Sequence, residues 1–152
     1  MSKNNSKKTK PSPTVGVLVF RDNFSKVLLV ENTTKTHHKI AIWGLPVGRV
    51  EKRESLINAT QRELLEETGL DAKIEDIIEL PIYYEEMIER KNGPKLYSMQ
   101  VFICNKYTSS LKANEETTPK WIEVLDMSKL NLIVNVKHTV EKAITILMEE
   151  KS

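Results

Sequence analysis

The chain has 152 residues, one cysteine and a formal net charge of +2. This length suits a single domain with a full hydrophobic core, and a lone cysteine excludes an internal disulfide framework. No apolar run approaches the length of a membrane span, and the N-terminus lacks the apolar segment of a secretory signal. We therefore expect a cytoplasmic protein that makes no contact with a membrane.

The positive charge is concentrated at the start of the chain. Residues 1–13 hold four lysines and no acidic residue, and the rest of the segment is mostly Ser, Asn and Pro, a composition typical of disorder. We therefore divide the chain into a disordered basic tail, residues 1–13, and a folded domain, residues 14–152. The tail could meet a nucleic acid or another anionic partner. A solvated tail is the interpretation we prefer, so nucleic acid is not expected as a partner.

The residues before the central motif predict a hairpin and a further strand. Two β-branched runs flank Asp22-Asn23, a pair that favours a hairpin turn. A polar loop, residues 32–39, follows the second run and precedes the strand that leads into the motif. The predicted strands cover residues 14–20, 27–30 and 40–43.

Residues 48–70 predict a turn followed by one helix. Ser55 can cap the helix start by accepting a backbone N–H bond, and Gly69 suits the left-handed residue that ends a helix. Three glutamates at spacing i, i+3 and i+4 place their carboxylates on one face, where like charges repel. Alone, such a set is first interpreted as a solvated acidic face, but beside this turn it suits Mg²⁺ or Mn²⁺. The three glutamates are Glu63, Glu66 and Glu67.

The second half of the chain predicts further strands and a closing helix. Two strand segments are separated by Pro81, which cannot donate a ladder hydrogen bond, and Asn92-Gly93 marks a turn into a long partner strand. A polar loop, a short strand and a turn follow, and then apolar residues recur at helical spacing. Strands interrupted by one central helix and closed by another predict an α/β fold. The strands are expected at residues 74–80, 82–88, 96–107 and 121–124, and the closing helix at residues 134–151.

The central motif resembles the Nudix box, G-x5-E-x7-R-E-U-x-E-E-x-G-U, in which U is aliphatic. Every fixed position matches, and with residue frequencies of roughly 5–7% a chance match at a given start is on the order of 10⁻¹⁰. One departure lies beside the box, because Val47 stands where the family commonly has a glycine. The matching residues are Gly48, Glu54, Arg62, Glu63, Leu64, Glu66, Glu67, Gly69 and Leu70.

The resemblance implies a Nudix-like α/β/α sandwich with a mixed β-sheet and a loop–helix–loop catalytic segment. Divalent ions would neutralise a diphosphate there and lower the pKa of a bound water. Arg62 is expected to orient a glutamate through paired hydrogen bonds, and Glu54 to brace the loop or a water beyond the ligands. The implied metal ligands are the carbonyl group of Gly48 and the carboxylates of Glu63, Glu66 and Glu67.

Further residues are candidates for roles around this segment. Family members often carry one more acidic residue in a loop before the last strand, and Glu115 and Glu116 are the candidates, with solvated loop acids as an equal interpretation. The proton acceptor among these two and the box glutamates stays open. Lys39 is a candidate contact to substrate phosphates, and Tyr83, Tyr84 and Tyr97 are candidates to stack on a nucleobase. For these four residues, an ordinary surface loop or simple packing is the alternative.

The activity implied by the resemblance is a pyrophosphohydrolase that acts on a nucleoside diphosphate linked to another group. Features that mark the ADP-ribose, dinucleoside polyphosphate, NADH and coenzyme A subclasses are missing. By elimination, this favours a nucleoside triphosphate, including a damaged one, cleaved to a monophosphate and pyrophosphate. The alternatives are an ADP-ribose or other nucleotide-sugar or dinucleotide pyrophosphatase, a nucleotide-sensing domain without turnover, and removal of phosphates from an RNA 5′ end. The expected partner is a small-molecule nucleotide; a homodimer is also compatible with the family, and no residue of the sequence decides it.

Overall fold

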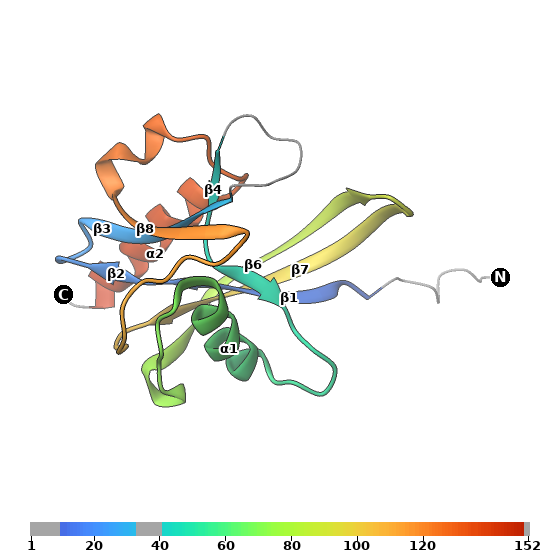
Figure 1. Ribbon diagram of the computed structural model, residues 1–152, viewed down its shortest axis with the longest axis horizontal. Helices are drawn as coiled ribbons and strands as arrows, with labels where there is room; N and C mark the ends of the chain where they lie inside the picture. Colours follow the sequence, from blue (N-terminus) through green and yellow to red (C-terminus); the bar gives the residue numbers. More distant parts are fainter. Residues whose placement is uncertain (1–9, 33–40, 151–152) are drawn as a thin grey trace.

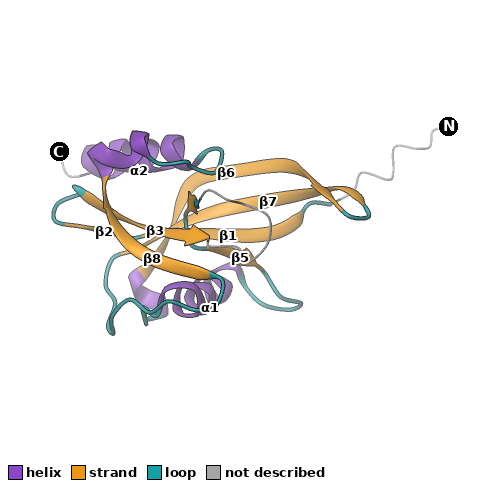
Figure 2. Ribbon diagram, turned by 45° about the horizontal axis from the view of Figure 1, so that its top comes forward, coloured by secondary structure: helices purple, strands orange, loops and turns teal. Residues whose placement is uncertain are grey.

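The structure, a computed structural model, describes residues 10–32 and 41–150. Two β-sheets lie between two helices, with α1 on one side and α2 on the other (Figure 1). Figure 2 shows the same layers after a turn that brings the top forward. The elements are β1 (Ser12–Leu18), β2 (Phe20–Arg21), β3 (Lys26–Asn32), β4 (Ile42–Gly44), β5 (Val47–Arg49), α1 (Leu56–Thr68), β6 (Ile77–Arg90), β7 (Gly93–Cys104), β8 (Thr117–Glu123) and α2 (Val136–Glu150), with 3-10 helices at Ile74–Asp76 and Val124–Lys129.

The larger sheet has the strand order β5-β1-β7-β6 and is mixed. β1 pairs in parallel with β7 and antiparallel with β5, and β6 and β7 form a long antiparallel hairpin. The smaller sheet has the order β2-β3-β4, and β8 pairs antiparallel with β3. The predicted α/β fold with a mixed sheet is therefore confirmed.

The core forms two clusters, because successive side chains of a strand point to opposite faces. From β1, Val15 and Val17 pack in a cluster that includes Leu64 of α1, while Leu18 packs in a second cluster with Val140 of α2. All five side chains are at most 1% exposed. Burying one large apolar side chain in this way stabilises the fold by about 1.5–3 kcal/mol. The contacts of Leu64 fix α1 against the sheet that carries β5.

The first predicted hairpin is partly wrong. β1 begins at Ser12, within the segment predicted to be a disordered tail, and its partners are β5 and β7 rather than β3. The hairpin joins β2 to β3 through a turn that contains Asp22 and Asn23, both at positive φ. The long parallel ladder between β1 and β7 joins segments far apart in the chain, so local turn signals do not report it.

Pro81 does not divide the following strand as predicted. β6 runs continuously from Ile77 to Arg90, and its register with β7 is irregular between Glu79 and Tyr83. The side chain of Gln100 donates from Nε2 to the carbonyl groups of Leu80 and Ile82, at 2.7 and 3.1 Å. These bonds satisfy acceptors that the irregular ladder leaves open, so the proline is tolerated in a bulge.

Other element boundaries also differ from the prediction. Residues 74–76 form a 3-10 helix rather than the start of a strand, β7 ends at Cys104, and β8 begins earlier than expected, at Thr117. The closing helix is confirmed as α2, Val136–Glu150. Among residues 10–32 and 41–150, no helix is long and apolar enough to cross a membrane.

Candidate active site

The helix of the box, α1, is capped at both ends. Ser55 Oγ accepts the backbone N–H of Asn58 at 3.1 Å, which satisfies one of the free donors at the start of α1. Gly69 has a φ of 86° and its N–H is bonded to the carbonyl of Leu65. Both predicted caps are confirmed. In the loop, Arg53 adopts a φ of 68°, a left-handed conformation that usually favours glycine.

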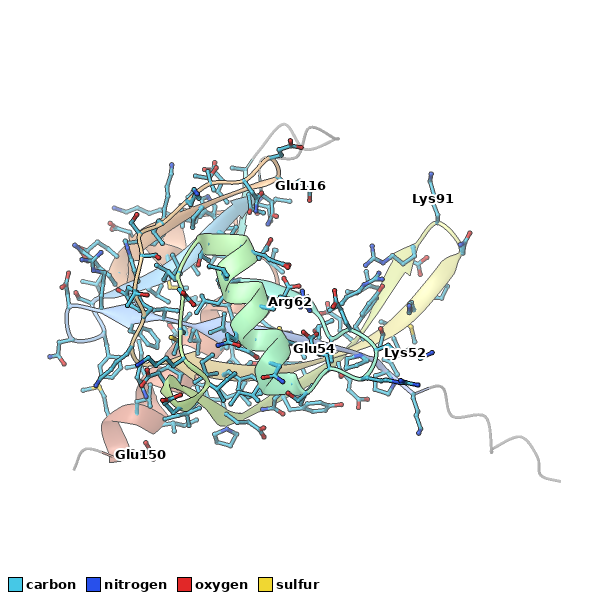
Figure 3. All side chains as sticks on the ribbon, turned by 60° about the horizontal axis from the view of Figure 1, so that its bottom comes forward. Lys52, Glu54, Arg62, Lys91, Glu116 and Glu150 are labelled. Atoms are coloured by element: carbon cyan, nitrogen blue, oxygen red, sulfur yellow. The ribbon has the colours of Figure 1, made fainter. Side chains whose placement is uncertain are left out.

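Arg62 is the centre of a hydrogen-bond network that joins this loop to α1. Its Nε and Nη2 donate to the two carboxylate oxygens of Glu54, both at 2.8 Å, and Nη2 also donates to the carbonyl of Arg49 at 2.9 Å. Its Nη1 donates to Glu63 at 2.7 Å and to Glu66 at 3.2 Å. A guanidinium has five N–H donors, so all of them are used. Figure 3 shows Glu54 and Arg62 close together at the box helix.

The charges in this network are unevenly matched. Hydrogen bonds from Arg62 and from the backbone N–H of Glu51 lower the pKa of Glu54 to about 2. The hydrogen bond to Glu54 raises the pKa of Arg62, which stays charged. For Glu63, burial raises the pKa and outweighs the bond from Arg62. The positive charge of Arg62 is therefore matched first by Glu54, and less of it compensates the glutamates of the helix.

Glu67 is the least compensated of the three helix glutamates. Burial raises its pKa to about 7, and the charges of Glu63, Glu116 and Glu66 act in the same direction. Glu116 comes from the loop before β8, and Figure 3 places it near one end of α1. Asn114 holds this loop, because its Nδ2 donates to the carbonyl of Glu66 and its Oδ1 accepts the backbone N–H of Glu116. Of the two loop acids, Glu116 is thus the one that is brought to the box.

The donor chemistry of this cluster fits a hard divalent cation. Carboxylate and carbonyl oxygens are the ligands of Mg²⁺, and a Cβ at Gly48 would overlap the carboxylate of Glu63. Glycine therefore lets this carboxylate lie directly against the backbone of β5. In the described part of the chain, no three carboxylates, histidines or cysteines converge on one point, and Arg62 Nη1 is bonded to both Glu63 and Glu66. Binding a cation with this set requires those two side chains to turn from Arg62, so the ligand roles stay predictions.

A pocket of about 370 Å³ opens beside the cluster. Gly48 and Glu67 lie on one wall, and β6, β7 and the segment before α2 supply the other walls. The apolar lining residues include Val47, Met99 and Val134. A mostly apolar cavity with a few polar groups suits a small organic ligand that carries a charged end.

The predicted contact residues differ in their relation to this pocket. Tyr97 lines it, but the side chain is only 6% exposed and its hydroxyl is held by two arginines, which leaves no open ring face for stacking. Tyr83 lies outside it, 53% exposed, and donates its hydroxyl to Glu85 at 2.7 Å. Its neighbour Tyr84 lines the pocket instead and is bonded to Thr139 at 2.8 Å. Lys39 lies outside the described residues.

The sequence does not single out three charged residues that line the pocket, Arg49, Glu86 and Arg90. Alternation along β6 is a signal that could have found two of them, since residues 84, 86, 88 and 90 share one face of the strand. Arg49 follows the box glycine directly, but its direction depends on the pairing of β5 with β1.

Comparisons with known proteins agree with this geometry. The chain is 29% identical over 133 residues to the m7GpppN-mRNA hydrolase of Saccharomyces cerevisiae, which covers 88% of this chain and 13% of that protein. It is 31% identical over 98 residues to the 8-oxo-dGTP diphosphatase of Buchnera aphidicola, covering 64% of this chain and 73% of that one. The solution structure of the E. coli ORF135 protein has a TM-score of 0.72 at 21% identity, with 95% of both chains covered.

The chain thus spans about an eighth of the yeast relative and most of the bacterial one. The NUDIX domain family matches residues 10–142, which include every strand of the described chain, the box and the first half of α2. This match covers far more than the box on which the resemblance was first drawn. The chain belongs to the Nudix family.

Proposed function

We propose that this chain is a divalent-metal-dependent hydrolase that cleaves a diphosphate linkage in a nucleotide. The favoured substrate is a nucleoside triphosphate, including a damaged one, which is cleaved to a monophosphate and pyrophosphate. The observation that carries the proposal is the position of Glu67 on the pocket wall beside Gly48, where other carboxylates act on it and burial raises its pKa. Because Arg62 has no N–H left to offer, a cation is the group that this wall needs.

The residues of this wall would have two roles, binding of the cation and transfer of the proton. Mg²⁺ or Mn²⁺ bound by Gly48, Glu63, Glu66 and Glu67 would supply charge neutralisation and activation of a water. Glu54 and Arg62 keep the loop and the helix in register through their paired hydrogen bonds. The proton of the attacking water passes to a carboxylate, and the acceptor stays open among Glu63, Glu66, Glu67, Glu115 and Glu116.

The relatives support a nucleotide as the substrate. One is named for 8-oxo-dGTP, and others of lower coverage are named phosphatase NudJ. The pocket also supports a nucleotide. Its apolar walls can receive a base, and they lie next to the wall that holds Gly48 and Glu67, here called the carboxylate wall, where the phosphates would bind.

The test is pyrophosphate and phosphate release from the purified protein with Mg²⁺. The panel holds nucleoside triphosphates with and without an oxidised base, ADP-ribose, dinucleoside polyphosphates and nucleotide sugars. We expect release from a triphosphate, and a fall in kcat of about 10²-fold or more for Glu67→Gln. Glu150→Gln makes the same chemical change at an exposed position near the end of α2 and should leave kcat unchanged. Nucleotide binding without release from any substrate would favour a sensing domain instead.

A second candidate is removal of phosphates from an RNA 5′ end. The observation that favours it is the yeast relative, which is named m7GpppN-mRNA hydrolase and aligns with 88% of this chain. A short RNA with a 5′-triphosphate or a cap, compared with the free nucleotide, separates the two candidates. If the lysines of residues 1–9 contact RNA phosphates, their removal should weaken the RNA-specific activity and make it less dependent on salt; equal rates with and without them would end this idea.

A further inference from the structure

A second group of charged side chains gathers around Tyr97, farther along the pocket from the carboxylate wall. Arg49 Nη2 donates to Tyr97 Oη at 3.1 Å, and Arg90 Nε donates to the same oxygen at 2.9 Å. Lys95 Nζ lies 5.5 Å from the ring centre. These residues come from β5, β6 and β7, and the β6–β7 hairpin extends as an arm beyond the rest of the sheet (Figure 1).

The hydroxyl of Tyr97 has one hydrogen to donate. Both arginines use the phenol oxygen as an acceptor, so its own O–H stays available as a donor. Within residues 10–32 and 41–150, no hydrogen bond takes up this hydrogen. The phenol O–H therefore has no acceptor in the described chain, and it lies beside two guanidinium groups.

The positive charge of this group is also not matched. No ion pair within 4.0 Å joins Arg49, Arg90 or Lys95 to an acidic residue of the described chain. Glu86 lies opposite Tyr97 in the β6–β7 ladder and lines the same pocket, but it makes none of these pairs. Burial alone would raise the pKa of Tyr97, yet the bond from Arg90 and the nearby positive charges lower it. Cations held this close repel one another, and an anion relieves that repulsion.

The group is fixed relative to the box. Arg49 follows Gly48, and its carbonyl accepts the Nη2 of Arg62 at 2.9 Å. Arg49 and Arg90 line the pocket that has Glu67 on its wall, and with Tyr97 they also line a second hollow toward the β6–β7 turn. An anion held on the side of the first pocket would belong to the same ligand as the phosphates that meet Glu67.

We propose that Arg49, Arg90 and the Tyr97 hydroxyl form an anion-binding subsite for a phosphate of the substrate other than the two that flank the cleaved bond. The planar guanidinium groups donate paired hydrogen bonds that match phosphate oxygens, and Tyr97 adds its free O–H. The inference rests on the proposed function, and it sharpens the substrate class. Nucleotides with three or more phosphates in a row occupy both sites, whereas ADP-ribose, with two, leaves the subsite empty.

The test is a calorimetric titration of the metal-free protein with inorganic tripolyphosphate at low salt. Without a cation the carboxylate wall repels an anion, so binding reports the subsite. We expect Arg90→Gln and Tyr97→Phe each to weaken binding about tenfold, because each removes a donor to the anion or the tether that aligns one. Lys142→Gln, at an exposed position on α2, makes the same change in net charge as Arg90→Gln and should alter affinity less than about twofold.

The outcomes separate the subsite from the hydrolase proposal. Arg90 is exposed and Tyr97→Phe keeps the buried ring, and thermal melting confirms that each variant is folded. Failure of the wild type to bind tripolyphosphate, or equal affinity in all variants, overturns the subsite. Selective binding in a protein that releases no phosphate from the substrate panel refutes the hydrolase proposal and leaves the subsite in place.

Discussion

Glu54→Gln removes the charge that is most strongly paired in the structure while keeping the shape of the side chain. Glu54 accepts two hydrogen bonds of 2.8 Å from Arg62 and one of 2.9 Å from the backbone N–H of Glu51. Its pKa falls from the usual 4.5 to about 2, and at 1.36 kcal/mol per pKa unit this gives an upper limit of about 3.4 kcal/mol. The side chains of Glu54 and Arg62 are 15% and 23% exposed. Solvent screening reduces the expected loss of unfolding free energy to about 2 kcal/mol at pH 7.

The pH dependence of this loss provides the sharper test. A carboxylate whose pKa is lowered by folding stabilises the protein fully above about pH 4.5, and the stabilisation is lost as pH falls toward about 2. The difference between the wild type and Glu54→Gln should therefore shrink to less than half by about pH 3. Urea unfolding followed by the fluorescence of Trp43 and Trp121 measures it. The reasoning is wrong if the difference at pH 7 is below about 0.5 kcal/mol, the usual range for exposed surface positions, or if it is as large at pH 3 as at pH 7.

Three other substitutions test separate parts of the site. Gly48→Ala places a Cβ where the carboxylate of Glu63 lies, so we expect loss of Mg²⁺-dependent turnover with little change in melting temperature; unchanged turnover would contradict the packing argument. Arg53→Gly relieves a φ of 68° and should raise the free energy of unfolding by about 0.5–1 kcal/mol, as measured by urea titration; a decrease would show that the left-handed loop costs nothing. Leu64→Ala removes a fully buried side chain from the inner face of α1 and should cost about 2–5 kcal/mol, whereas Leu65→Ala, at a half-exposed position of the same helix, is the control and should cost far less.

The box and its helix could be predicted from the sequence because their signals are local. Ser55 and Gly69 act on backbone groups within four residues, and the spacing of the glutamates is set by one helix. The α/β fold could be predicted for a similar reason, since runs of alternation and one helical period are both visible in a short window. The contact between Arg62 and Glu54 spans eight residues within the motif, and the geometry agrees with the paired bonds expected there.

The pocket could not be predicted to the same degree because its walls come from pairings between distant segments. Arg49 and Tyr97 meet through the β1 ladder, and their contact joins residues 48 positions apart. Of the two neighbouring tyrosines, Tyr84 rather than Tyr83 lines the pocket, because successive side chains of β6 point to opposite faces. Asn114 ties the loop that holds Glu116 to the end of α1, and the charge of Glu116 acts on Glu67 across 49 positions of the chain that no local pattern connects.

The β6–β7 hairpin is a part of the molecule where substrate range can diverge while the chemistry is kept. A Cβ at Gly93, at its tip, meets nothing within 4 Å in the described part of the chain, so the turn faces open space, while the φ of 103° at Gly93 favours glycine there. Two residues added to each strand keep every side chain on its face and lengthen the arm by about 6–7 Å, roughly the span of one further phosphate unit or more. Such insertions leave the contacts of Arg62 unchanged. A set of variants that differ only in the length of the β6–β7 hairpin, with the box unchanged, should therefore differ in the length of phosphate chain that each one prefers.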